Sequence, residues 1–246
     1  GQFIYDLNCI IDSRKRDLDV ILQLGYASSA IWHFLLPKKS IIITNMDGLE
    51  WKRSKFSKII RFYIKFAEWL TVKYSQYLIS DSIGIQSYFQ NKYSIDSKYI
   101  PYGATLVNKC NEDDLQQFSL EAYNYNLIIS RMEPENNIEI MLQGFVNSES
   151  DRKMVVIGST KNKYGQYIKS KFSDERIMYL GYVSGIDKLN ILRNYSHLYF
   201  HGHTVGGTNP SLLEAMSSNV LICAHNNKFN KVILGDDAFY FNCNKC

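Results

Sequence analysis

The residues best suited to binding chemistry gather in one stretch, residues 201–216, which reads HGHTVGGTNPSLLEAM. The stretch follows an apolar run, residues 198–200, that is typical of a buried strand. Asn209 is a good helix N-cap, and Pro210 suits the first helical position because its missing N–H group would have no partner there. The spacing therefore predicts a strand, a glycine-containing loop and a short helix in immediate succession.

The N-terminus of this predicted helix is suited to an anion. N–H groups in a first helical turn lack intrahelical partners, and the helix dipole adds partial positive charge there. The residues expected to surround a phosphate are Gly206, Gly207, Thr208, Asn209, Ser211, Leu212 and Leu213. Glu214, one turn into the helix, could accept hydrogen bonds from sugar hydroxyls. These features predict a bound nucleotide, and the alternative is a turn that merely caps an ordinary α/β unit.

Two histidines precede the glycines. His203 is a candidate hydrogen-bond partner for a sugar attached to the nucleotide. His201 lies two residues earlier, on the same face of the predicted strand, and could instead serve packing. A structural role stays open for both imidazoles.

The second half of the chain alternates between predicted strands and helices, a pattern typical of a parallel sheet. The expected strands are residues 126–130, 153–157, 176–180, 196–200, 219–223 and 238–241. The expected helices are residues 136–147, 162–172, 186–194, 210–217 and 228–234. Ligands of such sheets bind at the carboxyl ends of the strands. Arg131, after the first strand, could grip a diphosphate with its guanidinium or pair with a nearby glutamate, and Gly158 would leave space for a nucleotide.

The first half of the chain also alternates between predicted strands and predicted helices. Its apolar runs at residues 19–24, 40–44 and 77–80 are typical of strands, and helices are expected at residues 3–11, 28–36, 51–74 and 82–88. A polar segment that contains Asp47 follows the second of these strands. Its position favours a binding role, and its Asp-Gly pair is equally compatible with a simple turn.

Residues 51–74 form the most unusual predicted helix. Residues 51–67 contain six cations and many aromatic residues but no acidic residue. The helix could be a core element with a solvated basic face. Alternatively, residues 52–70 could rest on anionic lipid headgroups. We do not expect nucleic-acid binding, because no nucleic-acid motif accompanies the charge.

Composition limits the other classes of function. The 246 residues suffice for one large or two modest domains, and no apolar run is long enough to span a membrane. The net charge of +4 comes from the first 104 residues, which carry 14 basic against 9 acidic side chains. The five cysteines show no disulfide framework, which favours a reducing cytoplasm. Cys243 and Cys246 lack further ligands nearby, so no metal site is expected.

Residues 201–216 resemble the donor-site signature of the family 4 glycosyltransferases of GT-B fold. In that signature a glutamate, a glycine-rich segment and a second glutamate follow a strand. With Glu214 as the second glutamate, the first position is occupied by Gly206. Residues 202–216 are similar to one branch of the family, the bacterial rhamnosyltransferase-like enzymes of polysaccharide assembly, in which His203 would fill part of the missing glutamate's space.

The resemblance implies an α/β, GT-B-type fold with two Rossmann-like parallel-sheet domains. Residues 1–104 would form an incomplete acceptor-binding domain, and residues 105–246 a donor-binding domain without its last helices. Asp47 would contact the acceptor or take part in catalysis. The family's Arg and Lys at the diphosphate correspond to Arg131 and Asn136, whereas Tyr182 and Val183 would line the base pocket.

The resemblance implies a retaining glycosyltransferase, and the residues named above suit one that works without a metal or a cofactor. Fixed donors at the diphosphate would stabilise the leaving group. The expected partners are a nucleotide sugar, with dTDP-rhamnose implied by the resemblance, and a lipid-linked saccharide. We expect a cytoplasmic protein at the inner face of the cell membrane. The alternatives are a non-catalytic nucleotide-sugar-binding protein and a nucleotide-sugar epimerase or phosphorylase of the same fold.

Overall fold

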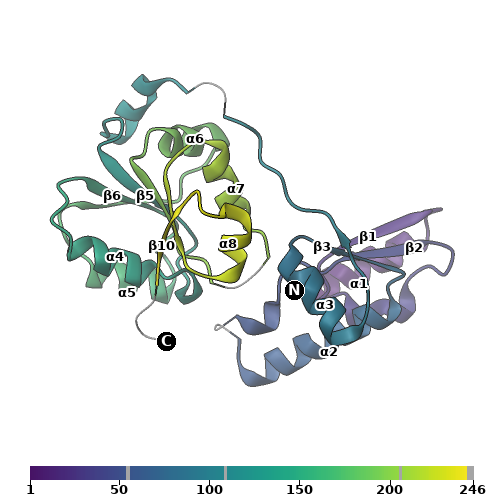
Figure 1. Cartoon of the computed structure of the whole chain (residues 1–246). Coiled ribbons are helices and arrows are strands. Elements are labelled where there is room, and N and C mark those ends of the chain that lie inside the picture. The colour runs from purple at the N-terminus through teal and green to yellow at the C-terminus, as the bar shows by residue number, and fades with distance from the viewer. Residues whose placement is uncertain (54–55, 108–109, 205–206, 243–246) are drawn as a thin grey trace. The chain divides into compact units, whose positions relative to one another are not determined.

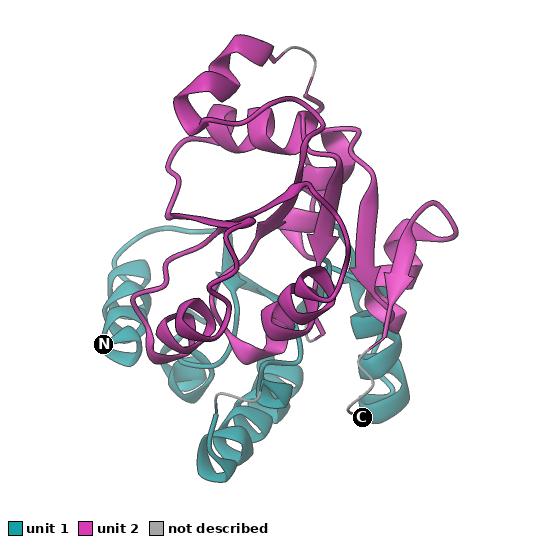
Figure 2. Cartoon of the chain, turned by 90° about the vertical axis from the view of Figure 1, so that its left-hand side faces the viewer, with its two compact units in different colours: residues 1–101, 205–208 teal, residues 102–204, 209–246 magenta. Residues whose placement is uncertain are grey.

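The computed structural model describes residues 1–53, 56–107, 110–204 and 207–242 (Figure 1). The chain divides into two compact units, which Figure 2 distinguishes by colour. The first comprises residues 1–101 together with 205–208, and the second comprises residues 102–204 and 209–246. This division differs in two respects from the domain boundary expected after residue 104. The chain divides after Pro101, and residues 205–208 group with the first unit.

The first unit contains a four-stranded sheet in the order β1-β2-β3-β4, with every neighbouring pair parallel. Its strands are β1 (Val20–Leu24), β2 (Ile41–Asn45), β3 (Tyr77–Ser80) and β4 (Lys98–Tyr99). Its helices are α1 (Gln2–Ser13), α2 (Lys58–Tyr74) and α3 (Ile83–Tyr93), with short 3₁₀ helices η1 (Ala30–Leu35) and η2 (Glu50–Lys52).

The helix expected over residues 51–74 is shorter in the structure. Glu50–Lys52 form the separate turn η2, and α2 begins only at Lys58. Ser57 explains this start, because its hydroxyl accepts a hydrogen bond from Ile60 N and caps the helix. Part of the expected basic segment therefore precedes the helix rather than belonging to it.

The second unit contains a six-stranded parallel sheet in the order β10-β9-β8-β5-β6-β7. The strands are β5 (Tyr125–Ile129), β6 (Lys153–Ile157), β7 (Ile177–Gly181), β8 (Leu198–His201), β9 (Ile222–His225) and β10 (Phe239–Phe241). The helices are α4 (Ile138–Val146), α5 (Lys163–Lys171), α6 (Ile186–Asn194), α7 (Pro210–Ser217) and α8 (Lys228–Leu234), with 3₁₀ helices η3 (Glu112–Phe118) and η4 (Pro134–Asn136).

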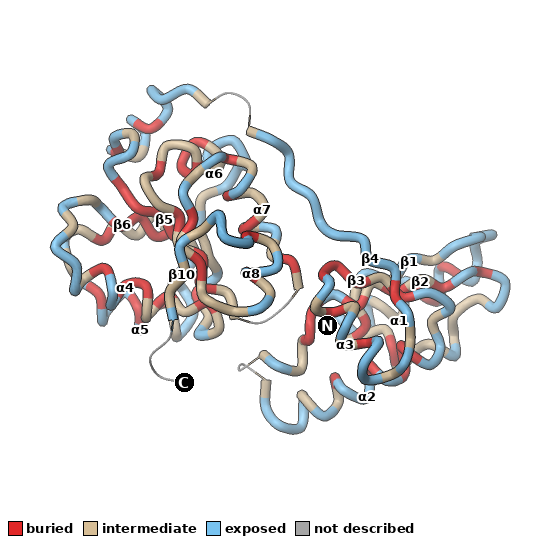
Figure 3. Tube along the Cα trace, in the orientation of Figure 1, coloured by how far each residue is buried: buried red, intermediate tan, exposed pale blue. Residues whose placement is uncertain are grey.

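The core of the second unit lies on both faces of its sheet, where Figure 3 shows buried residues along β5 and β6. Leu127 and Val155 belong to one apolar cluster, and their sequence neighbours Ile128 and Val156 belong to the other. Alternate residues of a strand point to opposite faces, so continuous apolar runs are required when helices cover both. This explains why the strands could be located from the sequence.

The expected strand at residues 219–223 begins later, at Ile222. Asn219 has a φ of 54°, in the left-handed region, and its N–H donates to Met216 O at 3.1 Å. It therefore belongs to the turn that ends α7. Among the described residues, no helix is both long enough and apolar enough to cross a membrane.

Candidate functional site

The centre of the second sheet brings two loops of the predicted donor site together. The chain runs from β5 outward through β6 and β7, then returns to place β8 on the other side of β5. Arg131 follows β5 and His203 follows β8, so both lie at the carboxyl edge of this switch point. Open α/β sheets bind their ligands at such a position.

These two loops are hydrogen-bonded to each other. Asn137 Nδ2 donates to Gly202 O at 2.9 Å, and both Thr204 N and Thr204 Oγ1 donate to Glu135 O, at 3.2 and 2.8 Å. A side chain at residue 202 would not fit, because a Cβ atom there would lie 2.0 Å from Asn136 O. The two loops therefore form one closely packed surface.

A third loop, after β6, joins this surface through Gly158. A Cβ atom on Gly158 would lie 2.0 Å from Ser130 O, and its φ is 154°. Asn162 Nδ2 also donates to Met132 O at 2.7 Å. The space that Gly158 was expected to leave for a nucleotide is thus filled by the backbone of Ser130, and the glycine instead permits close packing of two loops.

Arg131 has an exposed side chain on a firmly held backbone. Its carbonyl oxygen accepts hydrogen bonds from Glu133 N and Asn136 Nδ2, both at 2.8 Å, and from Ser130 Oγ at 3.2 Å. The guanidinium is thus presented from a fixed point. Asn136 is only 1% exposed, so the expected phosphate contact is replaced by a structural role in this loop.

The amides at the start of α7 are not free, contrary to expectation. Asn209 Oδ1 accepts a hydrogen bond from Ser211 N at 2.9 Å, and Asn209 O accepts from Leu212 N and Leu213 N at 3.0 and 3.3 Å. A phosphate here would interact with the positive end of the dipole, and would reach Ser211 N only by displacing the cap. Gly206 lies outside the described residues.

Glu214 forms an ion pair that the sequence did not reveal. Its Oε2 accepts a hydrogen bond from Nη2 of Arg193 on α6. The Arg193 side chain is 1% exposed, whereas that of Glu214 is 34% exposed and faces solvent in part. Nη1 of Arg193 also donates to Asn190 Oδ1 at 3.3 Å. The buried guanidinium thus holds the Glu214 carboxylate in place and neutralises its charge.

The two histidines form a stack at the end of β8. The rings of His201 and His203 are 5.1 Å apart and inclined by 11°. Burial and the neighbouring His203 lower the pKa of His201 well below its usual value, so its ring is neutral. His201 therefore packs beneath His203, whose carbonyl oxygen accepts from Asn227 Nδ2 at 2.8 Å.

The proposed base-pocket residues follow β7. Tyr182 is 80% exposed, and Val183 is partly buried against the core of the second unit. Gly181 has a φ of 69°, a conformation that glycine adopts without strain. The Tyr182 ring is thus presented at the carboxyl edge of the sheet, directly after the edge strand β7.

In the first unit, Asp47 is exposed after β2 and has a φ of 48°. Its N–H donates to Asn45 Oδ1 at 3.1 Å. The segment is anchored by Trp51, whose Nε1 donates to Glu68 Oε2 at 3.0 Å. Glu68 is fully buried in α2 and also accepts hydrogen bonds from Tyr88, Lys92 and Tyr93. Sequence reasoning missed this buried carboxylate because it occurs in an otherwise basic helix.

Gly207 and Thr208 lie against Asp81 in the first unit. Thr208 Oγ1 donates to Asp81 O at 2.8 Å, and a Cβ atom on Gly207 would lie 2.1 Å from Asp81 Oδ1. Burial and the nearby Asp47 raise the pKa of Asp81 to about 6, although hydrogen bonds from Thr208 and Ser82 oppose that change.

Replacing Asp81 by asparagine should stabilise the protein above pH 6. The folded state binds the Asp81 proton more tightly than the unfolded state does, so the ionised form destabilises the fold. We expect the variant to exceed the wild type by up to about 3 kcal/mol at pH 7.5, and the difference to vanish near pH 4. Urea unfolding between these pH values measures it. The exposed Asp96→Asn is the control, and a gain that does not change with pH would contradict the prediction.

Comparison with known families identifies the second unit. A domain of unknown function, DUF1972, matches residues 23–105. The glycosyl transferases group 1 model matches residues 111–244, more than half of the chain. The chain belongs to the glycosyl transferases group 1 family. A comparison of this group 1 glycosyltransferase with curated protein sequences gave no match.

Solved structures share the fold at low identity. HepE of Anabaena, solved with UDP-glucose, is 14% identical with a TM-score of 0.78, and the match covers 97% of this chain and 68% of HepE. A TarM variant of S. aureus, solved with fondaparinux, α-GlcNAc-glycerol and UDP, is 16% identical with a TM-score of 0.71, covering 99% of this chain and 48% of TarM.

A third structure is a sucrose-phosphate synthase of Thermosynechococcus elongatus, 13% identical with a TM-score of 0.72, covering 91% of this chain and 60% of that protein. These comparisons confirm the expected α/β fold of GT-B type with parallel sheets. The family match, which covers residues 111–244, confirms the expected glycosyltransferase class of enzyme.

Proposed function

We propose that the protein transfers a sugar from a nucleoside-diphosphate donor to a saccharide hydroxyl, with retention at the anomeric carbon and without a metal. The observation that carries this proposal is the convergence of the Arg131 and His203 loops at the switch point of the second sheet. Glu214, on the helix after β8, adds a carboxylate for sugar hydroxyls.

In the proposed reaction, the bond between the anomeric carbon and the β-phosphate oxygen breaks. The acceptor oxygen forms its bond to the same face of that carbon, and its proton passes to the departing phosphate. Arg131 and the positive end of α7 would stabilise the developing negative charge, because the backbone that carries Arg131 and the helix itself are in place before the reaction begins. These donors would stabilise the charge of the departing diphosphate, a task that a metal cation performs in other enzymes. Neither a metal nor a cofactor is therefore part of the proposal.

For the donor we propose dTDP-rhamnose, supported by the resemblance of residues 202–216 to rhamnosyltransferase-like enzymes. HepE and TarM were solved with UDP-containing ligands, so UDP-glucose and UDP-galactose are the main competing donors. The exposed Tyr182 at the carboxyl edge of β7 would contact the base. His203, fixed on the neutral ring of His201, would contact the transferred sugar.

The experiment that tests this function measures binding before turnover. Adding dTDP, UDP or GDP should raise the melting temperature of the protein, because a ligand that binds only the folded state stabilises it. Labelled nucleotide sugar is then incubated with the protein and a lipid extract. Labelled lipid product supports a transferase. Nucleotide binding without product would indicate a binding protein. Conversion of the donor sugar in the absence of acceptor would indicate an epimerase. Absence of nucleotide binding would contradict the proposal.

We propose further that the acceptor is lipid-linked and that the first unit contacts a membrane through α2. Four large apolar side chains are exposed at helical spacing on α2: Ile59, Phe62, Phe66 and Trp69, of which Ile59 and Phe62 are 82% and 76% exposed. The cations Lys58, Lys65 and Lys73 are exposed on the same helix. This combination suits an interface with anionic lipid.

Substituting these three lysines by glutamine should weaken binding to anionic vesicles by roughly a hundredfold, since each contributes about 1 kcal/mol near such a surface. Co-sedimentation with vesicles of 70% phosphatidylcholine and 30% phosphatidylglycerol measures this. The control replaces Lys161, Lys163 and Lys169, which are exposed in the second unit, and produces the same change in net charge. Equal losses for both triple variants would refute a specific role for α2.

A further inference from the structure

Gly207 and Thr208, which are expected to surround the donor phosphate, belong to the first unit. Residues 205–208 group with that unit, although the chain before and after them belongs to the second. Of this segment the structure describes Gly207 and Thr208, which directly precede Asn209, the N-cap of α7. A side chain of the first unit that fixes these two residues would therefore influence nucleotide binding.

Asp81 holds Thr208 through both its main chain and its side chain. Its carbonyl oxygen accepts a hydrogen bond from Thr208 Oγ1 at 2.8 Å, and its carboxylate accepts one from the backbone N–H of Thr208. Asp81 is 1% exposed and lies between β3 and Ser82, the residue that caps α3. Because a strand and a capped helix hold Asp81 in place, its two hydrogen bonds fix Thr208 as well.

Gly207 packs directly on the Asp81 carboxylate. A Cβ atom at residue 207 would lie 2.1 and 2.4 Å from the two carboxylate oxygens, so any side chain there would collide with them. The backbone of Gly207 therefore rests against the same group that accepts the Thr208 N–H. One carboxylate thus contacts both described residues of the segment.

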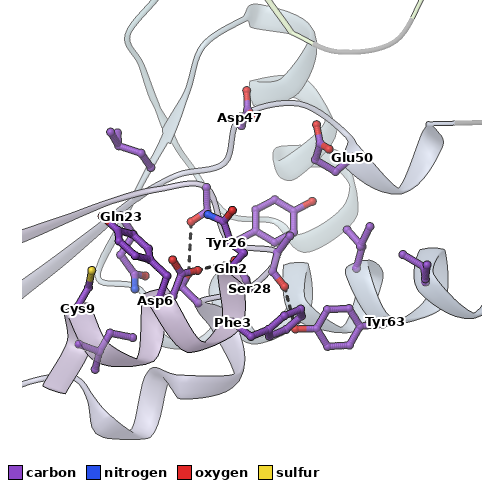
Figure 4. Close-up of a pocket in the computed structure, with 18 of the residues that line it drawn as sticks. Gln2, Phe3, Asp6, Cys9, Gln23, Tyr26, Ser28, Asp47, Glu50 and Tyr63 are labelled. Carbon is purple, nitrogen blue, oxygen red and sulfur yellow. Dashed lines mark hydrogen bonds between the residues drawn. The ribbon is translucent and has the colours of Figure 1, made fainter. Parts of the chain in front are cut away.

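The stability of the first unit does not explain this carboxylate. Asp81 Oδ1 has no hydrogen-bond partner among the described residues. Burial and the nearby Asp47, which lies at one end of the cavity shown in Figure 4, raise the pKa of Asp81 to about 6. The ionised side chain therefore destabilises the fold at neutral pH. Buried groups of this kind are typical of functional sites, and the contacts of Asp81 with Gly207 and Thr208 indicate which function it serves.

We propose that Asp81 is a positioning residue for the donor diphosphate: it holds Gly207 and Thr208 in the conformation that binds the phosphates and does not touch the nucleotide itself. The physical reason is preorganisation, because backbone groups that are fixed before binding lose less conformational entropy when the ligand arrives. This assignment rests on the proposed nucleotide-sugar donor and adds a residue of the first unit to its binding.

The test measures ligand affinity of the intact chain by calorimetry and saturation-transfer NMR. UDP and dTDP are compared with uridine and thymidine, which lack the phosphates. Asp81→Ala should weaken the tighter-binding diphosphate about tenfold, the usual effect of losing one hydrogen bond to a charged group, and should change nucleoside affinity by less than about twofold. Asp81→Asn keeps an oxygen for the Thr208 N–H and should restore most of the diphosphate affinity.

The matched control is Asp96→Ala, which removes an exposed carboxylate from the first unit. Equal diphosphate affinity in Asp81→Ala and Asp96→Ala would contradict the positioning role. A parallel loss of nucleoside affinity in Asp81→Ala would also contradict it, because a general disturbance of the fold does not distinguish the phosphates from the base.

A double-mutant cycle tests the contact between Gly207 and the carboxylate. Gly207→Ala should weaken the diphosphate in the wild-type background, where the new methyl group collides with Asp81. In the Asp81→Ala background the same change should cost at least about fivefold less affinity. Asp81→Ser takes the place of Asp81→Ala if that variant does not fold. Gly144→Ala, in open space on α4, is the control and should have no effect. Equal costs of Gly207→Ala in both backgrounds would overturn the proposed contact.

The wild type separates this proposal from the proposed function. Binding of UDP or dTDP by the wild type, with unchanged affinity in Asp81→Ala, would refute the positioning role alone and leave the donor as proposed. Failure of the wild type to bind either diphosphate would contradict the transferase function and the role of Asp81 together.

Discussion

Replacing Glu214 by alanine is expected to lower the free energy of unfolding by about 3 kcal/mol. The reason is Arg193, whose side chain is 1% exposed and would lose the carboxylate that balances its charge. Removing one member of a buried ion pair is more damaging than removing both, because the remaining charge cannot be hydrated. The expected loss lies at the lower end of the usual range because the Glu214 side chain is one-third exposed.

Urea unfolding of three variants tests this explanation. Glu214→Gln keeps an oxygen that can accept from Arg193 Nη2, so it should lose less stability than Glu214→Ala. The double variant Arg193→Met/Glu214→Met removes both charges and should recover most of the lost stability. The explanation would be wrong if Glu214→Ala lowered the free energy of unfolding by less than about 1 kcal/mol, or if the double variant did not recover it. Either result would show that the ion pair does not determine the stability at this position.

The expected instability of Glu214→Ala affects how activity measurements on Glu214 variants should be interpreted. An inactive Glu214→Ala protein would not establish a contact between Glu214 and a nucleotide, because the helix that carries it would itself be destabilised. Glu214→Gln is therefore the informative variant for ligand binding. Its affinity for UDP should be compared with that for 2′,3′-dideoxy-UDP, which lacks the ribose hydroxyls. A loss confined to UDP would indicate a hydroxyl contact.

Replacing Arg131 by methionine is expected to lower turnover by about 10²–10³-fold, the usual effect of removing one fixed donor at a developing negative charge. The fold should be preserved, because the Arg131 side chain is exposed and its backbone contacts do not depend on the guanidinium. Arg131→Lys should recover part of the rate, since it restores charge but not the bidentate fork.

Initial rates of sugar transfer from labelled donor, measured at saturating acceptor, test the Arg131 prediction. Urea unfolding of the same proteins shows whether stability is unchanged. Arg16→Met, which removes an exposed arginine that follows α1, is the control for loss of positive charge. Turnover that remains within threefold of the wild type in Arg131→Met would remove this residue from the proposed reaction.

The strands of the second unit were the part of the fold most accessible from sequence. The apolar runs around Leu127 and Val155 are continuous because both faces of the sheet are covered, and this pattern fixed their positions to within a residue or so. The start of α7 was likewise marked by Asn209 and Pro210. Local rules suffice where the cause of a structure is local.

The candidate site was less accessible because its contacts join distant residues. The sequence marks Asn209 as a cap, and the same cap occupies Ser211 N, one of the amides expected to bind a phosphate. The pairing of Arg193 with Glu214, and that of Glu68 with Trp51, depends on which helices pack together. An arginine or glutamate within a helix is typical of an exposed face, so composition gave no warning of these buried charges.

The close backbone approaches at Gly158 and Gly202 have a consequence for altering donor choice. Even a methyl group at either position would collide with a neighbouring carbonyl oxygen, so these positions cannot be varied without moving the loops. Tyr182 instead projects from the carboxyl edge of the sheet into open space. Libraries that aim to change the accepted nucleotide should therefore randomise such projecting side chains and leave Gly158 and Gly202 unchanged. The loops would then keep their positions, so that a change in nucleotide preference could be attributed to the new side chain.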